Sequence, residues 1–353
     1  MTEPLLRRGL LAAPLLLPLL PNPALAQRPR EAAPAAAPAA PPLAAPGSPW
    51  RGVNMAQVES HPFGGPDARL SMRRAAASGA DSVAIVPFLW QSGSASPDVS
   101  LGSDMSAEQL KAGIEQAREL GLRVLVKPHL WVQGGQPGQI LLPNAEAWRR
   151  WFTSYTAALL QVARVAQEAR AEALCIGSGL SRSLARAEWR GVIGPARSAF
   201  QGKLIQVVDS TEMADQVQHW DQLDAIGLKL YPALGRDDGP EEWSPVLRRE
   251  ADRIDRLAAR WRRRVWVAEV GLRSAAGAAA RPWEVVEDRR TQPDPRVQAE
   301  VLARWLHALD RPSVEAVLIW RWFTDPLRGG PQDSDFTVQN KLAEGVMLGA
   351  WAR

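Results

Sequence analysis

The chain has 353 residues, of which 46% are hydrophobic, and its 42 basic and 38 acidic side chains give a formal net charge of +4. This length accommodates one barrel-sized domain or two ordinary ones, and the apolar content is ample for a sizeable core. Almost all the basic residues are arginine, a bias that is weak evidence for a nucleic-acid partner, so none is expected. The single cysteine, Cys175, excludes internal disulfides, and its apolar neighbours indicate a small buried side chain.

The first residues have the order of an export signal. Arg7-Arg8 precedes a short apolar run and then Ala24-Leu25-Ala26, so we expect a signal peptide over residues 1–26, which also resembles the twin-arginine type. Two prolines interrupt the apolar run, which is too short for a bilayer of about 30 Å, so no stable membrane span is expected after cleavage. Residues 27–49 are mostly Ala and Pro and predict a linker, leaving a folded domain over 50–353 in the periplasm or outside the cell.

From Trp50 onward, short apolar runs alternate with longer amphipathic stretches. Such alternation predicts βαβ units, and eight of them over about 300 residues predict the α/β class and a (β/α)8 TIM barrel. An open doubly wound sheet is the alternative, but it normally has a glycine-rich turn after its first strand, which is missing here. Helices are expected over 106–120, with a capping box at its start, and over 144–169. The eight expected strands are 52–55, 82–87, 123–127, 173–177, 204–208, 225–228, 265–269 and 316–320.

In a barrel of this kind the chemistry lies at the carboxyl ends of the strands, so the residues there are the candidates. The seventh expected strand ends at Glu269, and the third is followed by a lysine, a histidine and a tryptophan. Tryptophans also follow the second and eighth strands, where a flat indole face suits either a protein core or a sugar ring. The strand ends therefore favour a carbohydrate cleft.

Several segments in chain order resemble glycoside hydrolase family 113, a family of retaining (β/α)8 glycosidases that includes β-mannanases. They are Lys127-Pro128-His129, Ile176-Gly177 with Leu180-Ser181-Arg182, Glu269-Val270-Gly271, and residues 322–344. The resemblance implies that Glu269 is the nucleophile, that Tyr231 lies near it, and that the partner is a polysaccharide or oligosaccharide. The substrate-binding residues expected at the strand ends are Asn54, Trp90, Lys127, His129, Trp131, Asp209, Tyr231, Trp320 and Trp322.

The fourth expected strand departs from the pattern of that family. Gly179 stands where the family pattern has the acid/base glutamate, and loss of a positioned general acid typically costs about 10²–10⁴ in rate. Lys229 likewise stands at a position resembling an aspartate site of the family. Glu212 is the tentative replacement acid.

Three functions are consistent with this sequence. The first is an active exported glycosidase that uses Glu269 with an acid from elsewhere, and the second is a catalytically silent barrel that binds glycans. The third is a barrel enzyme of unrelated chemistry in which Lys127 or Lys229 acts, since one fold hosts many reactions. No cofactor or metal is expected, because phosphate-loop and clustered Cys/His patterns are not visible, and the sequence predicts no particular oligomeric state.

Overall fold

The computed structural model describes residues 47–285 and 291–352. The expected export signal and most of the Ala/Pro-rich linker, residues 1–46, lie outside the described residues. The first strand, β1, begins at Trp50.

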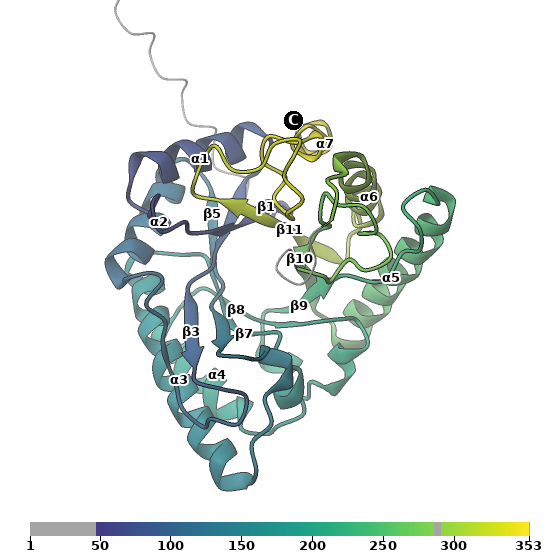
Figure 1. Ribbon diagram of the computed structural model, residues 1–353. Coiled ribbons are helices and arrows are strands. Elements are labelled where there is room, and N and C mark those ends of the chain that lie inside the picture. Colours follow the sequence, from purple (N-terminus) through teal and green to yellow (C-terminus); the bar gives the residue numbers. More distant parts are fainter. Residues whose placement is uncertain (1–46, 286–290, 353) are drawn as a thin grey trace, which may run out of the picture. The chain divides into compact units, whose positions relative to one another are not determined.

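Eight parallel strands close into a barrel, which confirms the predicted (β/α)8 architecture (Figure 1). All eight runs that were expected as strands lie in this barrel. Their order around it is β1-β11-β10-β9-β8-β7-β5-β2. The barrel strands are β1 Trp50–Ala56, β2 Ser82–Ile85, β5 Arg123–Val126, β7 Ala173–Ser178, β8 Lys203–Val208, β9 Ala225–Leu230, β10 Arg264–Val270 and β11 Val314–Phe323.

Helices surround the barrel, and the sequence explains how some of them begin (Figure 1). Ser106 and Gln109 form a complete capping box at the start of α2, as predicted. Eight strand–helix alternations were expected, but the connection between β8 and β9 holds only two short 3-10 helices in the described chain. Each of the other seven barrel strands is followed along the chain by an α-helix, so the predicted alternation holds except in this connection. None of the helices that the structure describes is long and apolar enough to cross a membrane. The α-helices are α1 Pro66–Ala77, α2 Ala107–Glu119, α3 Ala145–Glu168, α4 Trp189–Ala199, α5 Pro240–Trp261, α6 Pro295–Ala308 and α7 Leu342–Trp351.

The barrel interior is packed with apolar side chains at its lower end, where the strands begin, and becomes polar at its upper end, where the strands finish. Trp50 and Trp266 fill the lower end, with ring centroids 4.6 Å apart, and small side chains such as Ala173 and Ala225 fill the layer around them. Higher up, the Asn54 amide donates to the carbonyl oxygen of Ala268 at 3.0 Å. In the described residues the interior is therefore a packed core with polar groups at the carboxyl ends of its strands, where barrel enzymes have their sites. At the amino ends, a Lys203–Glu315 pair lies beside Trp266.

A second, three-stranded sheet extends the rim of the barrel and was not predicted. It contains β3 Phe88–Gln91, β4 Val99–Leu101 and β6 His129–Val132 in the order β4-β3-β6. β3 and β6 each begin two residues after a barrel strand ends, at Ile85 and at Val126. The second of those two residues is a proline, which has no backbone N–H to donate to a neighbouring strand. β3 pairs in parallel with β6, so that Trp90 lies beside Trp131.

Candidate active site

The carboxylate of Glu269 faces the barrel interior, although simple alternation along β10 would point it outward. Ala268 belongs to the inner layer of side chains, and adjacent residues of a strand normally face opposite sides. The pairing of β10 with β9 shifts between Val267 and Glu269, and an irregularity of this kind re-aims the side chains around it. Glu269 consequently points to the same interior as Lys127, with only 6% of its surface exposed.

Two hydrogen-bond donors hold the Glu269 carboxylate. Lys127 Nζ donates to Oε2 at 2.8 Å, and the Tyr231 hydroxyl donates to Oε1 at 2.9 Å. Burial acts to raise the pKa of Glu269, but the charges of Lys127 and Lys229 outweigh it and hold the pKa far below its usual range. The carboxylate therefore stays ionised at neutral pH.

Burial also shifts the pKa values of the side chains around Glu269. Burial lowers the pKa of Lys127, and the Glu269 charge offsets part of that effect. His129 Nε2 lies 3.8 Å from Glu269 Oε2, and burial together with the two lysine charges holds the pKa of His129 well below its usual value. Burial, then the Glu269 charge, raises the pKa of Tyr231. At neutral pH His129 is therefore a neutral imidazole and Tyr231 keeps its proton.

A second ion pair occupies the space in front of Gly179. Lys229 Nζ lies 3.4 Å from Asp209 Oδ1, and the Ser181 hydroxyl donates to Asp209 Oδ2 at 2.6 Å. Gly179 directly follows β7 with φ +69°, and a Cβ added there would lie 2.8 Å from Lys229 Nζ and 3.2 Å from Asp209 Oδ1. The volume that a longer side chain at position 179 would enter is thus filled by the ammonium group and its partner.

Lys229 also borders open space. A cavity of about 360 Å³ is lined by Asp209, Lys229 and Tyr231 and extends past Glu250 to Arg253. Burial acts to lower the pKa of Lys229, but the charges of Glu269 and Asp209 raise it above its ordinary value. The ammonium group therefore remains protonated while 18% of its side chain is exposed.

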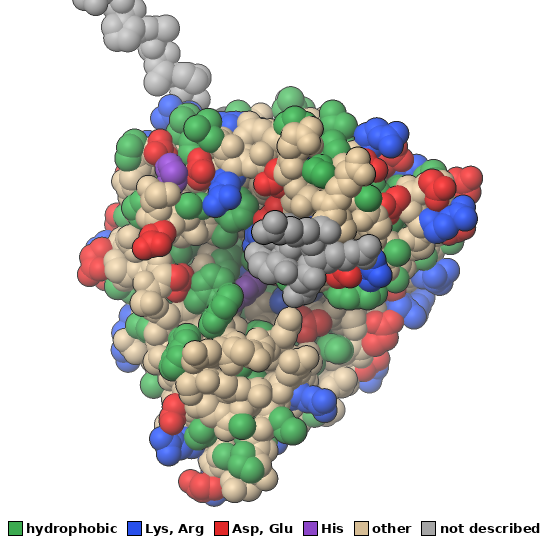
Figure 2. Space-filling model, viewed as in Figure 1, with side chains coloured by type: hydrophobic (Ala, Val, Ile, Leu, Met, Phe, Trp, Pro, Cys, Tyr) green, Lys and Arg blue, Asp and Glu red, His purple; other side chains and the backbone are tan. Residues whose placement is uncertain are grey.

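Aromatic rings form one wall of the site. The His129 imidazole stacks on Trp320, with centroids 5.5 Å apart and an interplanar angle of 20°. Phe88 meets both His129 and Trp131 edge to face, each at 6.1 Å. Trp90 and Trp131, on the paired strands β3 and β6, are 39% and 59% exposed. Figure 2 shows hydrophobic side chains along the central hollow of this face, beside a histidine. Exposed indole faces next to a carboxylate suit a sugar ligand.

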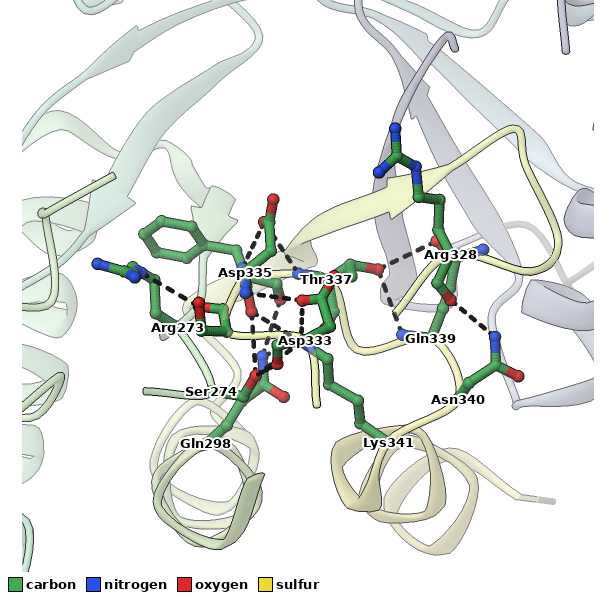
Figure 3. A network of polar contacts seen from close by, with 12 residues as sticks. Arg273, Ser274, Gln298, Arg328, Asp333, Asp335, Thr337, Gln339, Asn340 and Lys341 are labelled. Carbon is green, nitrogen blue, oxygen red and sulfur yellow. Dashed lines mark hydrogen bonds and ion pairs between the residues drawn. The ribbon is translucent and has the colours of Figure 1, made fainter. Parts of the chain in front are cut away.

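A polar network fixes the long loop between β11 and α7 over the site (Figure 3). The fully buried Lys341 ammonium donates to the Ser274 hydroxyl at 2.7 Å. Gln298 Nε2 donates to the backbone carbonyl oxygen of Phe336 at 2.9 Å, and the Phe336 ring packs edge to face on Tyr231 at 6.0 Å. Through this ring the loop supports the tyrosine that donates to Glu269.

The sequence of this barrel matches one family. The profile of glycoside hydrolase family 113 matches residues 56–341, which is most of the chain. The chain belongs to glycoside hydrolase family 113. A comparison with curated proteins gave no match.

Solved structures of family 113 enzymes share this fold. A GH113 β-1,4-mannanase has a TM-score of 0.76 and 23% identity, with 87% of this chain and 100% of that chain covered. The GH113 β-mannanase AaManA from Alicyclobacillus acidocaldarius, in complex with ManMIm, has a TM-score of 0.75 and 24% identity over 86% and 97% of the two chains. The β-glucuronidase of Ruminococcus gnavus is more distant, with a TM-score of 0.57 and 14% identity over 86% and 51%.

The structure brings most of the predicted site residues of this family 113 protein together. Glu269 contacts Lys127 and Tyr231 directly and lies near His129. The other predicted ligand contacts with exposed surface, Trp90, Trp131, Asp209 and Trp320, lie in the aromatic wall or the second ion pair.

Three predicted ligand contacts are corrected by the structure. Trp322 is fully buried and donates from its indole to Ser71 at 2.8 Å, so it belongs to the core. Asn54 is also fully buried and joins β1 to the backbone of β10 and β11. Lys127 is fully buried too and acts on Glu269 instead of on a ligand. The ends of the strands were predicted correctly, but the burial of these three side chains was not.

Glu212 lies in the loop after β8 and makes no hydrogen bond or ion pair to Glu269. It is paired with Arg253, and 59% of its side chain is exposed. Burial acts to raise its pKa, but hydrogen bonds from its own backbone and Ser210, with the Arg253 charge, lower the pKa overall. A lowered pKa favours the ionised form and disfavours a general-acid role.

The sequence reasoning missed two contacts of the site. Phe88 connects His129 to Trp131, and its signal in the sequence was an aromatic residue next to Pro87, just past β2. The Ser181 hydroxyl donates to Asp209. Ser181 was part of a segment that resembles the family, but no role in the site was predicted for it. Within residues 47–285 and 291–352, no group of three or more His, Cys, Asp or Glu side chains is placed to hold a metal ion.

Proposed function

We propose that this family 113 protein acts on β-linked manno-oligosaccharides or a related β-glycan, with Glu269 as the nucleophile of a retaining mechanism. The observation that supports this most is the Glu269 carboxylate itself, kept ionised by Lys127 and hydrogen-bonded by Tyr231 inside an aromatic-walled site. In such a mechanism a Glu269 oxygen bonds to the anomeric carbon as the glycosidic bond breaks, and water then releases the sugar. Relatives of similar fold are named as β-mannanases, which suggests the sugar.

Covalent trapping tests the proposed nucleophile. A 2-deoxy-2-fluoro-β-mannosyl fluoride should add one sugar to the full-length protein, because fluoride leaves without a proton and the 2-fluoro group slows release from Glu269. Intact mass spectrometry detects the label, and peptide mapping locates it. We also propose that the protein is exported, and the same mass measurement tests this by showing whether residues 1–26 have been removed.

The matched control is a second Glu–Lys pair at the opposite end of the barrel. Glu269→Gln should abolish the label, whereas Glu315→Gln, which alters the pair with Lys203, should leave it unchanged. A label on any residue other than Glu269, or none on wild-type protein with an intact fold, argues against the proposal.

A silent glycan-binding protein is the second candidate. It is favoured by the ion pair that fills the space at Gly179. It is also favoured by the hydrogen-bond and ion-pair partners of Glu269, which among the described residues are all neutral or cationic. Under this reading the cleft binds oligosaccharides and no label forms.

Both candidates predict that the exposed indole of Trp131 contributes to sugar binding. Trp131→Ala should weaken the affinity for a β-1,4-manno-oligosaccharide about tenfold, equivalent to about 1.4 kcal/mol. An exposed indole can pack against a sugar ring, while it adds little to the stability of the fold. Isothermal titration calorimetry measures the affinity. Leu348→Ala, an exposed apolar truncation on α7, is the control and should bind normally. Equal affinity in both variants would remove Trp131 from the binding surface.

A further inference from the structure

Lys229 lies where a retaining glycosidase of this kind needs to assist its leaving group. Lys229 lies beside the end of β7, since a Cβ added at Gly179 would be 2.8 Å from its ammonium nitrogen. Gly179 offers no proton donor, and its φ of +69° suits glycine. The assistance available there is a fixed positive charge.

The charges around Glu269 are balanced before reaction. Two cations, Lys127 and Lys229, lie with two carboxylates, Glu269 and Asp209. When Glu269 becomes a glycosyl ester it loses its charge, so this group of four side chains gains a net positive charge. A departing anion beside Lys229 restores the balance, and in a buried site such a charge interaction is strong.

We propose that the subsite beside Lys229 takes an aglycone that departs as an oxyanion, such as a phosphate or an acidic phenol, and that Lys229 stabilises this anion in place of a proton donor. This inference rests on the proposed role of Glu269 as nucleophile. A cavity of about 360 Å³ borders Lys229, Asp209 and Tyr231, so there is open space beside the ammonium group. Its further charged lining is the cations Arg249 and Arg253 and the carboxylates Glu212 and Glu250.

The two steps conserve atoms and charge. A Glu269 oxygen bonds to the anomeric carbon while the bond from that carbon to the aglycone oxygen breaks, and the electron pair leaves with that oxygen as an anion. A water oxygen then bonds to the anomeric carbon, the ester bond breaks to restore the Glu269 carboxylate, and the proton of the water passes to the released anion or to buffer. Lys229 donates no proton in either step, and before reaction its pKa is raised by the charges of Glu269 and Asp209.

The dependence of rate on leaving group tests this inference on the full-length protein. We expect kcat/KM to fall steeply from 2,4-dinitrophenyl to 4-nitrophenyl to phenyl β-mannoside, and β-mannosyl phosphate to be a substrate. Lys229→Met should lower kcat/KM for β-mannosyl phosphate and the dinitrophenyl glycoside about 10²-fold, the usual effect of losing one oxyanion-stabilising group. Lys229→Arg, which keeps the charge, should retain most of the rate. Lys203→Met, a charge loss at the far end of the barrel, is the control.

Each other outcome overturns the inference. A shallow dependence on leaving group, with cleavage of unactivated β-manno-oligosaccharides, would mean that a proton comes from elsewhere, while the labelling of Glu269 would still support the proposed function. Unchanged rates in Lys229→Met would show that its charge plays no part. If the fluorosugar labels neither wild type nor any variant, the proposed nucleophile and this inference both fail.

Discussion

Replacing Lys127 with methionine will destabilise the protein by about 3–5 kcal/mol, because it leaves the buried Glu269 carboxylate without its main counter-charge. The Lys127 side chain is fully buried and that of Glu269 is 7% exposed, so water cannot replace the lost partner. Tyr231 still donates one hydrogen bond, but a neutral donor offsets only part of the cost of a buried charge. Urea denaturation followed by tryptophan fluorescence measures the change in the free energy of unfolding.

Two further variants separate the ion pair from the loss of packing. The double variant Lys127→Met/Glu269→Gln should be more stable than Lys127→Met, since it buries no unpaired charge. Lys203→Met breaks a Lys–Glu pair that is 41% and 22% exposed, so it should cost about 1 kcal/mol or less. Similar losses in Lys127→Met and Lys203→Met would contradict the argument.

Acid should reduce the difference between wild type and Lys127→Met. The folded-state pKa of Glu269 is depressed, so its contribution to stability is complete above its ordinary value of 4.5 and is lost as the pH falls toward the folded-state pKa. Without Lys127 the folded-state pKa rises, because burial then acts with less opposition. The variant therefore loses less stability than wild type between pH 6 and about pH 4, which denaturation at both pH values measures.

The barrel was predictable from the sequence because its strands are short apolar runs separated by amphipathic helices. The capping box of Ser106 and Gln109 is equally local, since it needs only two side chains in one turn. The sheet of β3, β4 and β6 was not predictable in this way. Its β3–β6 pairing joins segments more than 40 residues apart, and strands of three or four residues are too short to give a periodic signal.

The site was predictable in its location but less so in its depth. The strand ends indicated Glu269, Lys127 and His129, and the family resemblance indicated Tyr231; these four residues lie together. Whether a side chain faces the cleft or the core depends on the register, and the shift beside Glu269 reverses the alternation that a reader of the sequence would apply. Trp322, two residues after the partly exposed Trp320, is fully buried for the same reason, because the pairing of β1 with β11 also shifts there.

Placing a glutamate at position 179 should create hydrolysis of unactivated β-glycans only when Lys229 is removed as well. A Cβ at Gly179 would lie 2.8 Å from Lys229 Nζ, so in Gly179→Glu the new carboxylate would pair with that ammonium and stay ionised. In the double variant Gly179→Glu/Lys229→Ala the ammonium group is gone, so the new carboxyl group has room and can carry a proton. We expect kcat/KM for a β-1,4-manno-oligosaccharide to rise about 10²–10⁴-fold over wild type. Reducing-sugar assays and product chromatography measure this gain.

The conformation of Gly179 sets a cost that the experiment must separate from chemistry. Its φ of +69° costs a residue with a side chain about 1–2 kcal/mol, so both 179 variants should unfold at lower urea concentration than wild type. Gly179→Gln/Lys229→Ala has the same shape and the same strain but no acidic proton, so it should stay inactive on the oligosaccharide. If the glutamate double variant folds, is labelled at Glu269 by the fluorosugar and still gains no hydrolysis, then the position of the missing acid is not at the end of β7, and the geometry between Gly179 and Lys229 serves binding alone.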